Sequence, residues 1–389
     1  MIRRSIRRSI RHGVGLLLRR PFTVVRIVAA ATALARLARA AHTLPPVRPT
    51  LTPSPAATGG ITVVVPARDE ADRIGPLLDA VVGAPGVTEV VVVDDGSTDA
   101  TAAIARRAGA RIVIGSPLPE GWTGKAWALQ QGVEAATTGW VVTLDADTRP
   151  ARELPLAAVT RAMEEGHHLL TVAGGFECPT APLRWLHPAM LTTLVYRFGP
   201  PGRAAPPPPH RTMANGQCTV LPRRGFLADG GLAAVADNPV EDVALARHLA
   251  GRGRSVGFLD ATELLTVRMY ESLGDAWRGW GRSLSLPGVE PRWRQLADLG
   301  VVVLAQALPL PRLLGARGDL LDGVLVAVRL GTLVGTARAY RQHGPAYWTS
   351  PLADVPAVVA LAAGMVSRRQ RWRGREYATP SPPARTAAR

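Results

Sequence analysis

The hydrophobic pattern between residues 61 and 144 changes period repeatedly, and this alternation predicts an α/β fold. Four short apolar runs are typical of buried strands: 61–65, 89–93, 112–114 and 140–144. Three segments between them repeat apolar residues at helical spacing: 74–82, 101–108 and 124–136. Strands and helices that alternate at this spacing form βαβ units. We therefore expect a Rossmann-like, mainly parallel sheet flanked by helices.

The last of these runs, Trp140–Leu144, leads directly into Asp145 and Asp147. In open α/β sheets, ligands bind at the edge formed by the carboxyl ends of the strands. Because strand side chains alternate, both carboxylates should point to one side, where they repel each other unless a cation lies between them. A hard divalent cation that also contacts phosphate oxygens meets this requirement. The alternative is a turn in which Asp147 caps the segment that follows.

Two further predicted strands also end in acidic residues. Asp69 and Glu70 follow the first strand, and Asp94 and Asp95 follow the second. Since the strands are expected to be parallel, three acidic loops should converge on one edge of the sheet. The alternative for the second loop is a turn whose serine or threonine caps the next helix, and the two roles are compatible.

The N-terminal part of the chain predicts an attachment to the folded domain. Residues 1–42 combine a run of arginines with an apolar stretch that contains Arg26. This pattern is typical of a basic amphipathic or membrane anchor and is a poor match to a spanning helix. Residues 43–60, rich in Pro, Thr and Gly, predict a linker. The main folded domain is expected over 61–290.

Three apolar segments follow that domain: 299–314, 320–336 and 352–366. Each is shorter than the ~20 residues that a spanning helix needs. Each also carries or adjoins polar residues, which are Gln306, Asp322 with Arg329, and Asp354. We expect membrane-associated helices over 291–367, with the proline-containing first segment re-entrant or interfacial, and a basic tail over 368–389.

Composition and charge favour a membrane surface over nucleic acid as the partner. The net charge is +16 and the pI about 11.3, but the arginines cluster beside apolar segments, as membrane-flanking residues do. Lys125 is the only lysine, and a compact ammonium is not equivalent to a guanidinium at a phosphate or carboxylate. We expect Lys125 to contact a diphosphate or the acidic cluster; the alternative is a surface lysine retained by chance. Cys178 and Cys218 show no metal-site spacing and favour a reducing compartment.

Several motifs, in order along the chain, resemble the nucleotide-sugar half of family 2 glycosyltransferases of the GT-A fold. They are V-V-P-A-R-D-E (64–70), V-V-D-D-G-S-T-D (92–99), G-W-T-G-K-A-W-A-L (121–129) and L-D-A-D (144–147). The resemblance continues through N-G-Q at 215–217 and the acidic helix start at 240–247, and covers about residues 60–290. R-M-Y at 268–270 and W-R-G-R-E-Y at 372–377 are closer still to the hopanoid-associated and carotenoid (diaponeurosporenoate-type) branch.

The resemblance implies a role for each matched residue. The D-x-D pair, Asp145 and Asp147, would hold Mg²⁺ or Mn²⁺ against the diphosphate of a sugar nucleotide. The donor side would comprise Arg68, Glu70, Asp94, Asp95, Lys125 and Asp145. Asp242 would be the general base of an inverting transfer, and its alternative role is to complement the dipole of the helix that it starts. The acceptor side would comprise Asn215, Gln217, Glu241 and Trp280.

One departure from the family pattern bears on the acceptor. Processive polysaccharide synthases carry Q-x-x-R-W after the base, whereas this chain has D-A-W-R-G-W-G-R at 275–282. We therefore expect transfer of a single sugar, from a donor that is a UDP-sugar by resemblance, to a hydrophobic lipid such as a carotenoid or hopanoid. This places the protein in the cell membrane, with the catalytic domain on the cytoplasmic side. The alternatives are a processive synthase, a non-catalytic membrane scaffold and a nucleic-acid binder.

Two further segments are expected near the acceptor and the membrane. Residues 199–211 contain four consecutive prolines and predict a stiff loop at the acceptor entrance. Trp277, Trp280 and Trp293 lie beside arginines, as residues of a membrane interface do. For Trp277, packing in a protein core is an equally good interpretation.

Overall fold

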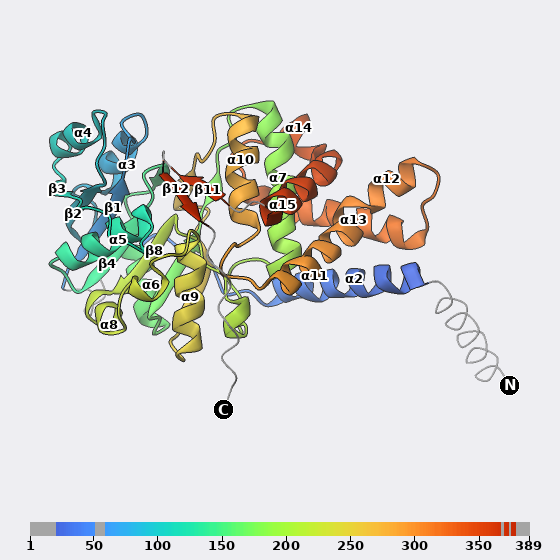
Figure 1. Cartoon of the computed structure of the whole chain (residues 1–389), viewed down its shortest axis with the longest axis horizontal. Coiled ribbons are helices and arrows are strands. Elements are labelled where there is room, and N and C mark those ends of the chain that lie inside the picture. Colours follow the sequence, from blue (N-terminus) through green and yellow to red (C-terminus); the bar gives the residue numbers. More distant parts are fainter. Residues whose placement is uncertain (1–20, 51–58, 367–368, 373–374, 379–389) are drawn as a thin grey trace.

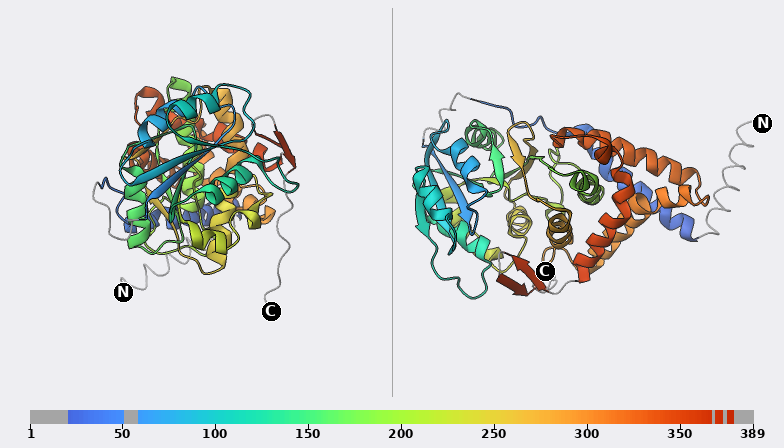
Figure 2. Two further views of the ribbon diagram at one scale, coloured as in Figure 1. Left: turned by 90° about the vertical axis from the view of Figure 1, so that its left-hand side faces the viewer. Right: turned by 90° about the horizontal axis from the view of Figure 1, so that it is seen from above.

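The computed structural model describes residues 21–50, 59–366, 369–372 and 375–378. Figure 1 shows an α/β lobe at one end of the molecule and a helical lobe at the other. In the view from above in Figure 2, the helices of the second lobe extend away from the sheet. The predicted anchor residues 1–20 and the last residues of the predicted tail lie outside the described part of the chain.

The α/β lobe is built on a seven-stranded sheet. In spatial order its strands are β3 (Arg111–Ile114), β2 (Val87–Asp94), β1 (Ile61–Ala67), β4 (Trp140–Leu144), β8 (Cys218–Pro222), β6 (Leu169–Ala173) and β9 (Val256–Asp260). The first four are parallel, β8 is antiparallel to β4 and β6, and β6 is parallel to β9. The expected mainly parallel sheet is confirmed. The carboxyl ends of β1, β2 and β4 therefore share one edge.

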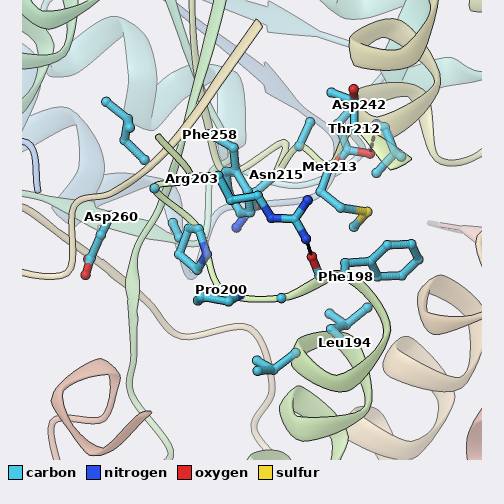
Figure 3. A pocket seen from close by; sticks show the side chains of 18 of the residues that line it. Leu194, Phe198, Pro200, Arg203, Thr212, Met213, Asn215, Asp242, Phe258 and Asp260 are labelled. Carbon is cyan, nitrogen blue, oxygen red and sulfur yellow. Dashed lines mark hydrogen bonds between the residues drawn. The ribbon is translucent and has the colours of Figure 1, made fainter. Parts of the chain in front are cut away.

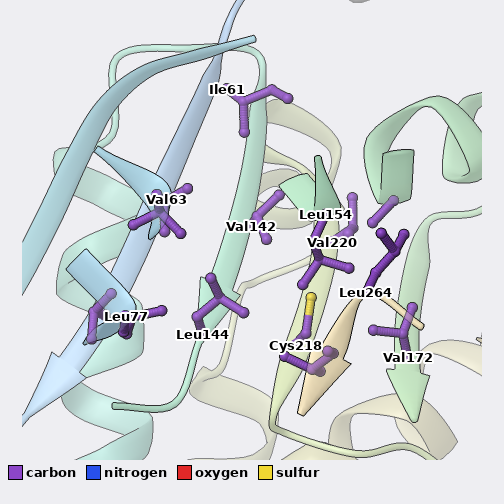
Figure 4. Close-up of a cluster of buried hydrophobic side chains, with 14 of the residues drawn as sticks. Ile61, Val63, Leu77, Val142, Leu144, Leu154, Val172, Cys218, Val220 and Leu264 are labelled. Atoms are coloured by element: carbon purple, nitrogen blue, oxygen red, sulfur yellow. The ribbon is translucent and has the colours of Figure 1, made fainter. Parts of the chain in front are cut away.

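Alternate residues of the central strands face opposite layers of helices. Val63 of β1 belongs to a buried cluster with Leu77 and Leu154 (Figure 4), whereas the next residue, Val64, packs in a second cluster with Val133. Helices α3 (Ile74–Val81) and α6 (Leu154–Glu164) line the first cluster, and α5 (Gly124–Ala135) and α9 (Glu241–Gly251) line the second. Burial on both faces explains why these strands are apolar throughout.

Every strand and helix predicted between residues 61 and 144 is present, and the bounds differ by at most two residues. A second, three-stranded sheet was not predicted. It consists of β5 (Thr148–Pro150), β10 (Leu265–Val267) and β7 (Gly175–Phe176). Since β5 follows Asp147 and pairs with β10, this sheet brings the start of the R-M-Y motif beside the D-x-D pair. The backbone N–H of Arg268 donates to the carbonyl of Asp147 at 3.3 Å.

The remaining helices complete the two lobes. Two short ones, α4 (Thr101–Arg107) and α8 (Arg223–Ala228), belong to the α/β lobe. The helical lobe contains α2 (Pro21–Leu37), α7 (Ala181–Phe198), α10 (Leu273–Leu284), α11 (Arg292–Val302), α12 (Pro309–Leu314), α13 (Leu320–Thr336), α14 (Pro345–Trp348) and α15 (Asp354–Val366). By length and composition, three helical stretches of the described chain can cross a membrane: Pro21–His42, Arg292–Leu314 and Leu320–Ala339.

The position of Arg26 corrects the expectation for the N-terminal apolar segment. Arg26 is only 1% exposed and donates to the carboxylates of Asp319 and Asp322 at the start of α13, with 2.6 Å between Arg26 Nη1 and Asp319 Oδ2. Its charge is therefore neutralised between two helices. Arg26 does not disqualify α2 as a spanning helix, because a paired charge no longer has to face lipid.

The other polar residues of the apolar segments also pair with one another. Arg329 of α13 contacts the Asp354 carboxylate at 2.9 Å, and Gln306 donates to the same carboxylate at 2.9 Å. Gln306 lies in a π-helical turn (Val303–Ala307) that joins α11 to α12. The proline-containing first segment is thus one continuous helical stretch that passes through a π turn.

The predicted linker and tail both contain ordered contacts. The backbone N–H of Leu44 donates to Gly202 at 2.6 Å and that of Val47 to Asp260 at 2.8 Å, so residues 43–50 lie along the α/β lobe. Residues 51–58 lie outside the described chain. Within the predicted basic tail, β11 (Arg369–Trp372) and β12 (Arg375–Ala378) pair as antiparallel strands.

Candidate functional site

The carboxyl edge of the sheet holds a cluster of charged residues around Lys125. The Lys125 ammonium, at the start of α5, lies 2.9 Å from Asp145 Oδ1 and 3.0 Å from Glu241 Oε1. Asp145 follows β4 and Glu241 begins α9, so three separate elements contribute to the cluster. The lysine singled out from composition is therefore in direct contact with the predicted acidic residues.

The ionisation of Lys125 and Asp145 reflects burial and mutual attraction. Burial opposes the charge of Lys125, but Asp145, Glu241 and Asp242 outweigh it and raise its pKa well above the usual value. For Asp145, burial raises the pKa to about 6, and Asp147 acts in the same direction while Lys125 opposes both. The carboxylates of Asp145 and Asp147 together carry more negative charge than the single Lys125 ammonium neutralises. This edge of the sheet therefore keeps a net negative charge.

Asp242 is held in place by the backbone. Its two carboxylate oxygens accept hydrogen bonds from the N–H groups of Gly216 and Val243, both at 2.7 Å. Burial, reinforced by Glu241, raises the pKa of Asp242 to about 6. A carboxylate with this pKa is suited to accept a proton near neutral pH.

The N-G-Q motif (residues 215–217) lies directly against Lys125 and Asp242. A Cβ atom at Gly216 would lie 3.0 Å from the Lys125 ammonium nitrogen, which explains the glycine. The side chains of Asn215 and Gln217 are joined by a 2.9 Å hydrogen bond, and Gln217 also reaches the Met269 sulfur at 3.7 Å. The two amides are therefore oriented before any substrate binds.

The predicted base-binding residues form a neighbouring cluster. Arg68 donates to the carbonyl of Asp95 at 2.9 Å, and its guanidinium lies 3.8 Å from the Asp95 carboxylate. Asp94 accepts the backbone N–H of Ser97 at 3.0 Å, but the predicted serine or threonine cap of the next helix is absent, and Asp99 accepts the backbone N–H of Thr101 at 2.9 Å instead. The backbone N–H of Glu70 donates to Thr101 at 2.8 Å. The loops after β1 and β2 thus contact each other, as predicted for a shared edge.

A cavity of about 1960 Å³ connects the acidic cluster to the helical lobe. Its polar wall includes Lys125, Asp145, Asp147, Asn215, Gln217, Glu241 and Asp242, whereas Asp94 and Asp95 are not among its lining residues. Its apolar part is lined by Leu34 and Leu37 of α2, Leu191 and Leu194 of α7, and Val328 of α13. The proline-rich loop 199–211 forms part of its wall (Figure 3), as expected for a loop near the acceptor.

The three tryptophans occupy different environments. Trp280 lines the cavity and is 6% exposed, and its ring packs edge-on against His187 with 4.8 Å between centroids. Its expected position at a membrane interface is therefore wrong, because the apolar core of the helical lobe covers it. Trp293 is 59% exposed and Trp277 37%, which suits an interface.

The D-x-D pair fits a divalent cation that is completed by a ligand. Asp145 and Asp147 both line the cavity, and no group of three or more His, Cys, Asp or Glu side chains with metal-site geometry occurs in the described residues. Mg²⁺ prefers six oxygen ligands and typically takes one or two carboxylates together with phosphate oxygens and water. A dicarboxylate edge beside a cavity supplies the protein share of such a site.

Some residues of the cavity were not predicted from the sequence. Arg73, Arg203 and Arg211 all line it. Arg203 and Arg211 belong to the proline-rich loop, in which their only sequence signal is a basic residue within an otherwise apolar segment. In a chain with many arginines, one more arginine does not stand out, whereas the single lysine does.

Comparisons with known sequences agree with the order of motifs. Residues 62–226 match the family model of glycosyl transferase family 2. A segment of 88 residues, 22% of this chain, is 42% identical to 4,4'-diaponeurosporenoate glycosyltransferase of Staphylococcus aureus (strain MRSA252) and covers 24% of that protein. The chain thus spans about a quarter of the length of the curated relatives that it matches.

One solved structure shows the same fold. A mannosyltransferase from Pyrobaculum calidifontis, in complex with GDP-Man and Mn²⁺, matches with a TM-score of 0.54 and 22% identity over 87% of this chain and 98% of that one. Glucosyl-3-phosphoglycerate synthase from Mycobacterium tuberculosis, in complex with Mn²⁺, UDP and glucosyl-3-phosphoglycerate, matches with a TM-score of 0.41 and 19% identity over 59% and 80%. The first likeness shows a shared fold.

Proposed function

We propose that the protein transfers a single sugar from a nucleotide-diphosphate sugar to a lipid, because residues 62–226 match the family model of glycosyl transferase family 2 and the chain shares the fold of a mannosyltransferase. A UDP-sugar is the first candidate donor. The observation that carries the proposal is one continuous cavity, whose polar wall holds the Lys125 cluster and whose apolar part lies between helices. A soluble acceptor would need no such apolar extension.

On the donor side, each charged residue has a distinct task. Asp145 and Asp147 would hold Mg²⁺ or Mn²⁺, which supplies charge stabilisation for the departing nucleotide. Lys125 neutralises the acidic edge and presents an ammonium to the diphosphate. Arg68, Glu70, Asp94 and Asp95 form the turns that face the base and ribose. The mannosyltransferase that shares this fold was solved in complex with GDP-Man and Mn²⁺, which supports this arrangement.

On the acceptor side, Asp242 is the proposed general base of an inverting transfer. It would take the proton from an acceptor hydroxyl as that oxygen attacks the anomeric carbon and the nucleoside diphosphate leaves. Its raised pKa and its two backbone hydrogen bonds support this role. Asn215, Gln217, Glu241 and Trp280 line the same cavity and would position the acceptor.

The lipid acceptor and the membrane location support each other. The three apolar helical stretches carry exposed apolar side chains, among them Val28 (59%), Leu314 (73%) and Val334 (63%). Contiguous exposed apolar surface of this kind suits a bilayer. We place the protein in the cell membrane with its catalytic domain on the cytoplasmic side, where nucleotide sugars are made. A carotenoid or hopanoid is the proposed type of acceptor, in keeping with the partial relative.

Two measurements test this proposal. Purified protein with Mg²⁺ or Mn²⁺ should release nucleoside diphosphate from a panel of UDP- and GDP-sugars, and a metal chelator should abolish the release. Lipid mass spectrometry of cells with and without the gene should show one lipid class that differs by the mass of one hexose. A ladder of hexose additions would instead indicate a processive synthase. Absence of both release and mass difference would leave a non-catalytic scaffold.

A further inference from the structure

Behind the part of the cavity wall that Arg211 lines, arginines outnumber the carboxylates that pair with them. Four arginines surround two buried carboxylates: Arg36, Arg197, Arg211 and Arg247 around Asp298 and Glu290. Asp298 is 3% exposed and Glu290 1%. Four guanidinium groups and two carboxylates leave an excess of two positive charges, much of it shielded from water.

Arg203 adds a fifth guanidinium at the same wall. It lines the cavity and, among the residues that the structure describes, forms no ion pair with a carboxylate. Its side chain donates to the backbone carbonyl of Phe198. Burial, followed by repulsion from Arg39, Arg211 and Arg36, lowers the pKa of Arg203. The local protein environment therefore opposes its charge.

The position of Arg203 in the cavity indicates which kind of ligand would balance the excess positive charge. Figure 3 shows its guanidinium between the apolar side chains of Leu194 and Phe198 and the polar side chains of Asn215 and Asp242. Arg203, the Lys125 cluster and the apolar residues of the helical lobe all line the same cavity. A guanidinium presents parallel N–H donors whose geometry matches a carboxylate or a phosphate.

We propose that Arg203 binds an anionic head group, a carboxylate or a phosphate, on the lipid acceptor. This inference rests on the proposed function and makes the acceptor class more specific. The cavity then has two walls of opposite sign: the acidic wall at Asp145 suits the cation of the donor complex, and the basic wall at Arg203 suits the anion of the acceptor. The apolar remainder of the acceptor would lie along α2, α7 and α13.

Binding can be tested without any sugar transfer. The full-length protein in non-ionic detergent is titrated by calorimetry with decanoate, decyl phosphate, decanol and inorganic phosphate. The wild type should bind decanoate or decyl phosphate about tenfold or more tighter than decanol, because a hydrogen bond between two charged groups is stronger than one to a neutral hydroxyl. Arg203→Gln should remove this preference and leave decanol binding unchanged, and Arg203→Lys should restore part of it.

A second arginine of the same cavity provides the matched control. Arg254 also lines it but already donates two hydrogen bonds to Asp229, at 2.9 and 2.6 Å. Arg254→Gln should therefore keep the preference for the anionic amphiphiles. Unchanged decanol binding and an unchanged melting temperature show that Arg203→Gln is folded.

The outcomes separate this inference from the proposed function. Equal affinity for decanol and the two anions, or a preference that survives in Arg203→Gln, overturns it. So does tight binding of inorganic phosphate at this wall that decanoate cannot displace, because the site would then take a free ion only. If the protein bound anions through Arg203 but did not turn over nucleotide sugars, the proposed function would be wrong and this inference would stand. If it turned over nucleotide sugars without preferring anionic amphiphiles, this inference would be wrong and the proposed function would stand.

Discussion

At the scale of single residues, the cavity is governed by how burial and charge set protonation. Asp242 is half-buried, hydrogen-bonded by two backbone N–H groups and close to Glu241 and Lys125, and the balance raises its pKa to about 6. A base of this pKa is ionised at pH 7 yet still takes up a proton readily. An exposed aspartate, with a pKa near 4, would be a weaker base.

This balance predicts the pH dependence of the reaction. As the pH falls through about 6, Asp242 becomes protonated and kcat/KM should decline, with the lower plateau at acid pH. Asp242→Asn should lose about 10²–10⁴-fold in rate and keep only the part of the acid limb that comes from Asp145, whose pKa is also about 6. Nucleotide release across pH 5–8 measures both. Asp237→Asn, which removes an exposed carboxylate five residues away, should behave like the wild type. Nearly full activity of Asp242→Asn would mean that the acceptor oxygen needs no base.

Lys125 allows an equally specific prediction. The Lys125 ammonium contacts Asp145 and Glu241, and Gly216 borders it so closely that a Cβ there would be 3.0 Å from the nitrogen. A guanidinium is larger and planar, so Lys125→Arg should misplace the charge despite conserving it. We expect kcat to fall about tenfold or more, given the strength of charged hydrogen bonds. Steady-state kinetics measure this; an unchanged kcat would mean that only the charge of Lys125 matters.

The residues of the acidic wall were predictable, whereas those of the basic wall were not. Asp145 and Lys125 each carry a local signal, one by following an apolar strand and the other by being the only lysine. Arg203 acquires its significance from Arg36 and Arg39, which are more than 160 residues away in the sequence, together with Arg211 of its own loop. No local pattern encodes an excess of charge that arises in three dimensions.

At the scale of elements, the helical lobe is held together by buried ion pairs. Arg26 of α2 joins two aspartates at the start of α13, and Asp322 is fully buried. Removing one partner leaves an unpaired charge in a place with little water. These contacts connect helices that are almost 300 residues apart in the sequence.

Arg26→Met should therefore destabilise the protein. Loss of one partner of a buried ion pair lowers the free energy of unfolding by about 3–5 kcal/mol. We expect a smaller decrease of roughly 2–3 kcal/mol, because Arg312 still contacts Asp322 at 3.0 Å. Thermal unfolding in detergent measures the change. Arg39→Met, at an exposed arginine that follows the same helix, should have little effect, and Arg26→Met combined with Asp322→Asn should recover part of the loss. Equal melting temperatures for Arg26→Met and Arg39→Met would contradict this account.

The same pairs explain where element prediction succeeded and failed. The strands between residues 61 and 144 were predictable because helices cover both of their faces, which makes them apolar throughout. The apolar helices were harder to interpret because Arg26, Gln306, Arg329 and Asp354 interrupt their hydrophobic pattern. Only the structure shows that these residues form hydrogen bonds and ion pairs with other polar residues of the helical lobe.

At the scale of the whole molecule, the cavity joins two different environments. Its polar end lies at the sheet edge, where a water-soluble donor would bind, and its apolar end lies among α2, α7 and α13. A lipid that stays partly in the bilayer could then meet a nucleotide sugar without crossing open water. The division into two lobes is what makes this possible, since neither lobe lines the cavity alone.

Blocking the apolar end should therefore impair transfer while sparing donor chemistry. Gly331 of α13 lines the cavity, and a Cβ atom there would meet nothing within 4 Å, so Gly331→Trp can fold yet fill the space. We expect transfer to the lipid acceptor to fall about tenfold or more, because a large ring displaces the acceptor chain, with slow donor hydrolysis unchanged. Gly323→Trp is the matched control, because Gly323 lies on the same helix, has equal free space and does not line the cavity. If both variants transferred sugar at the wild-type rate, the acceptor would reach Asp242 by a path that does not pass α13.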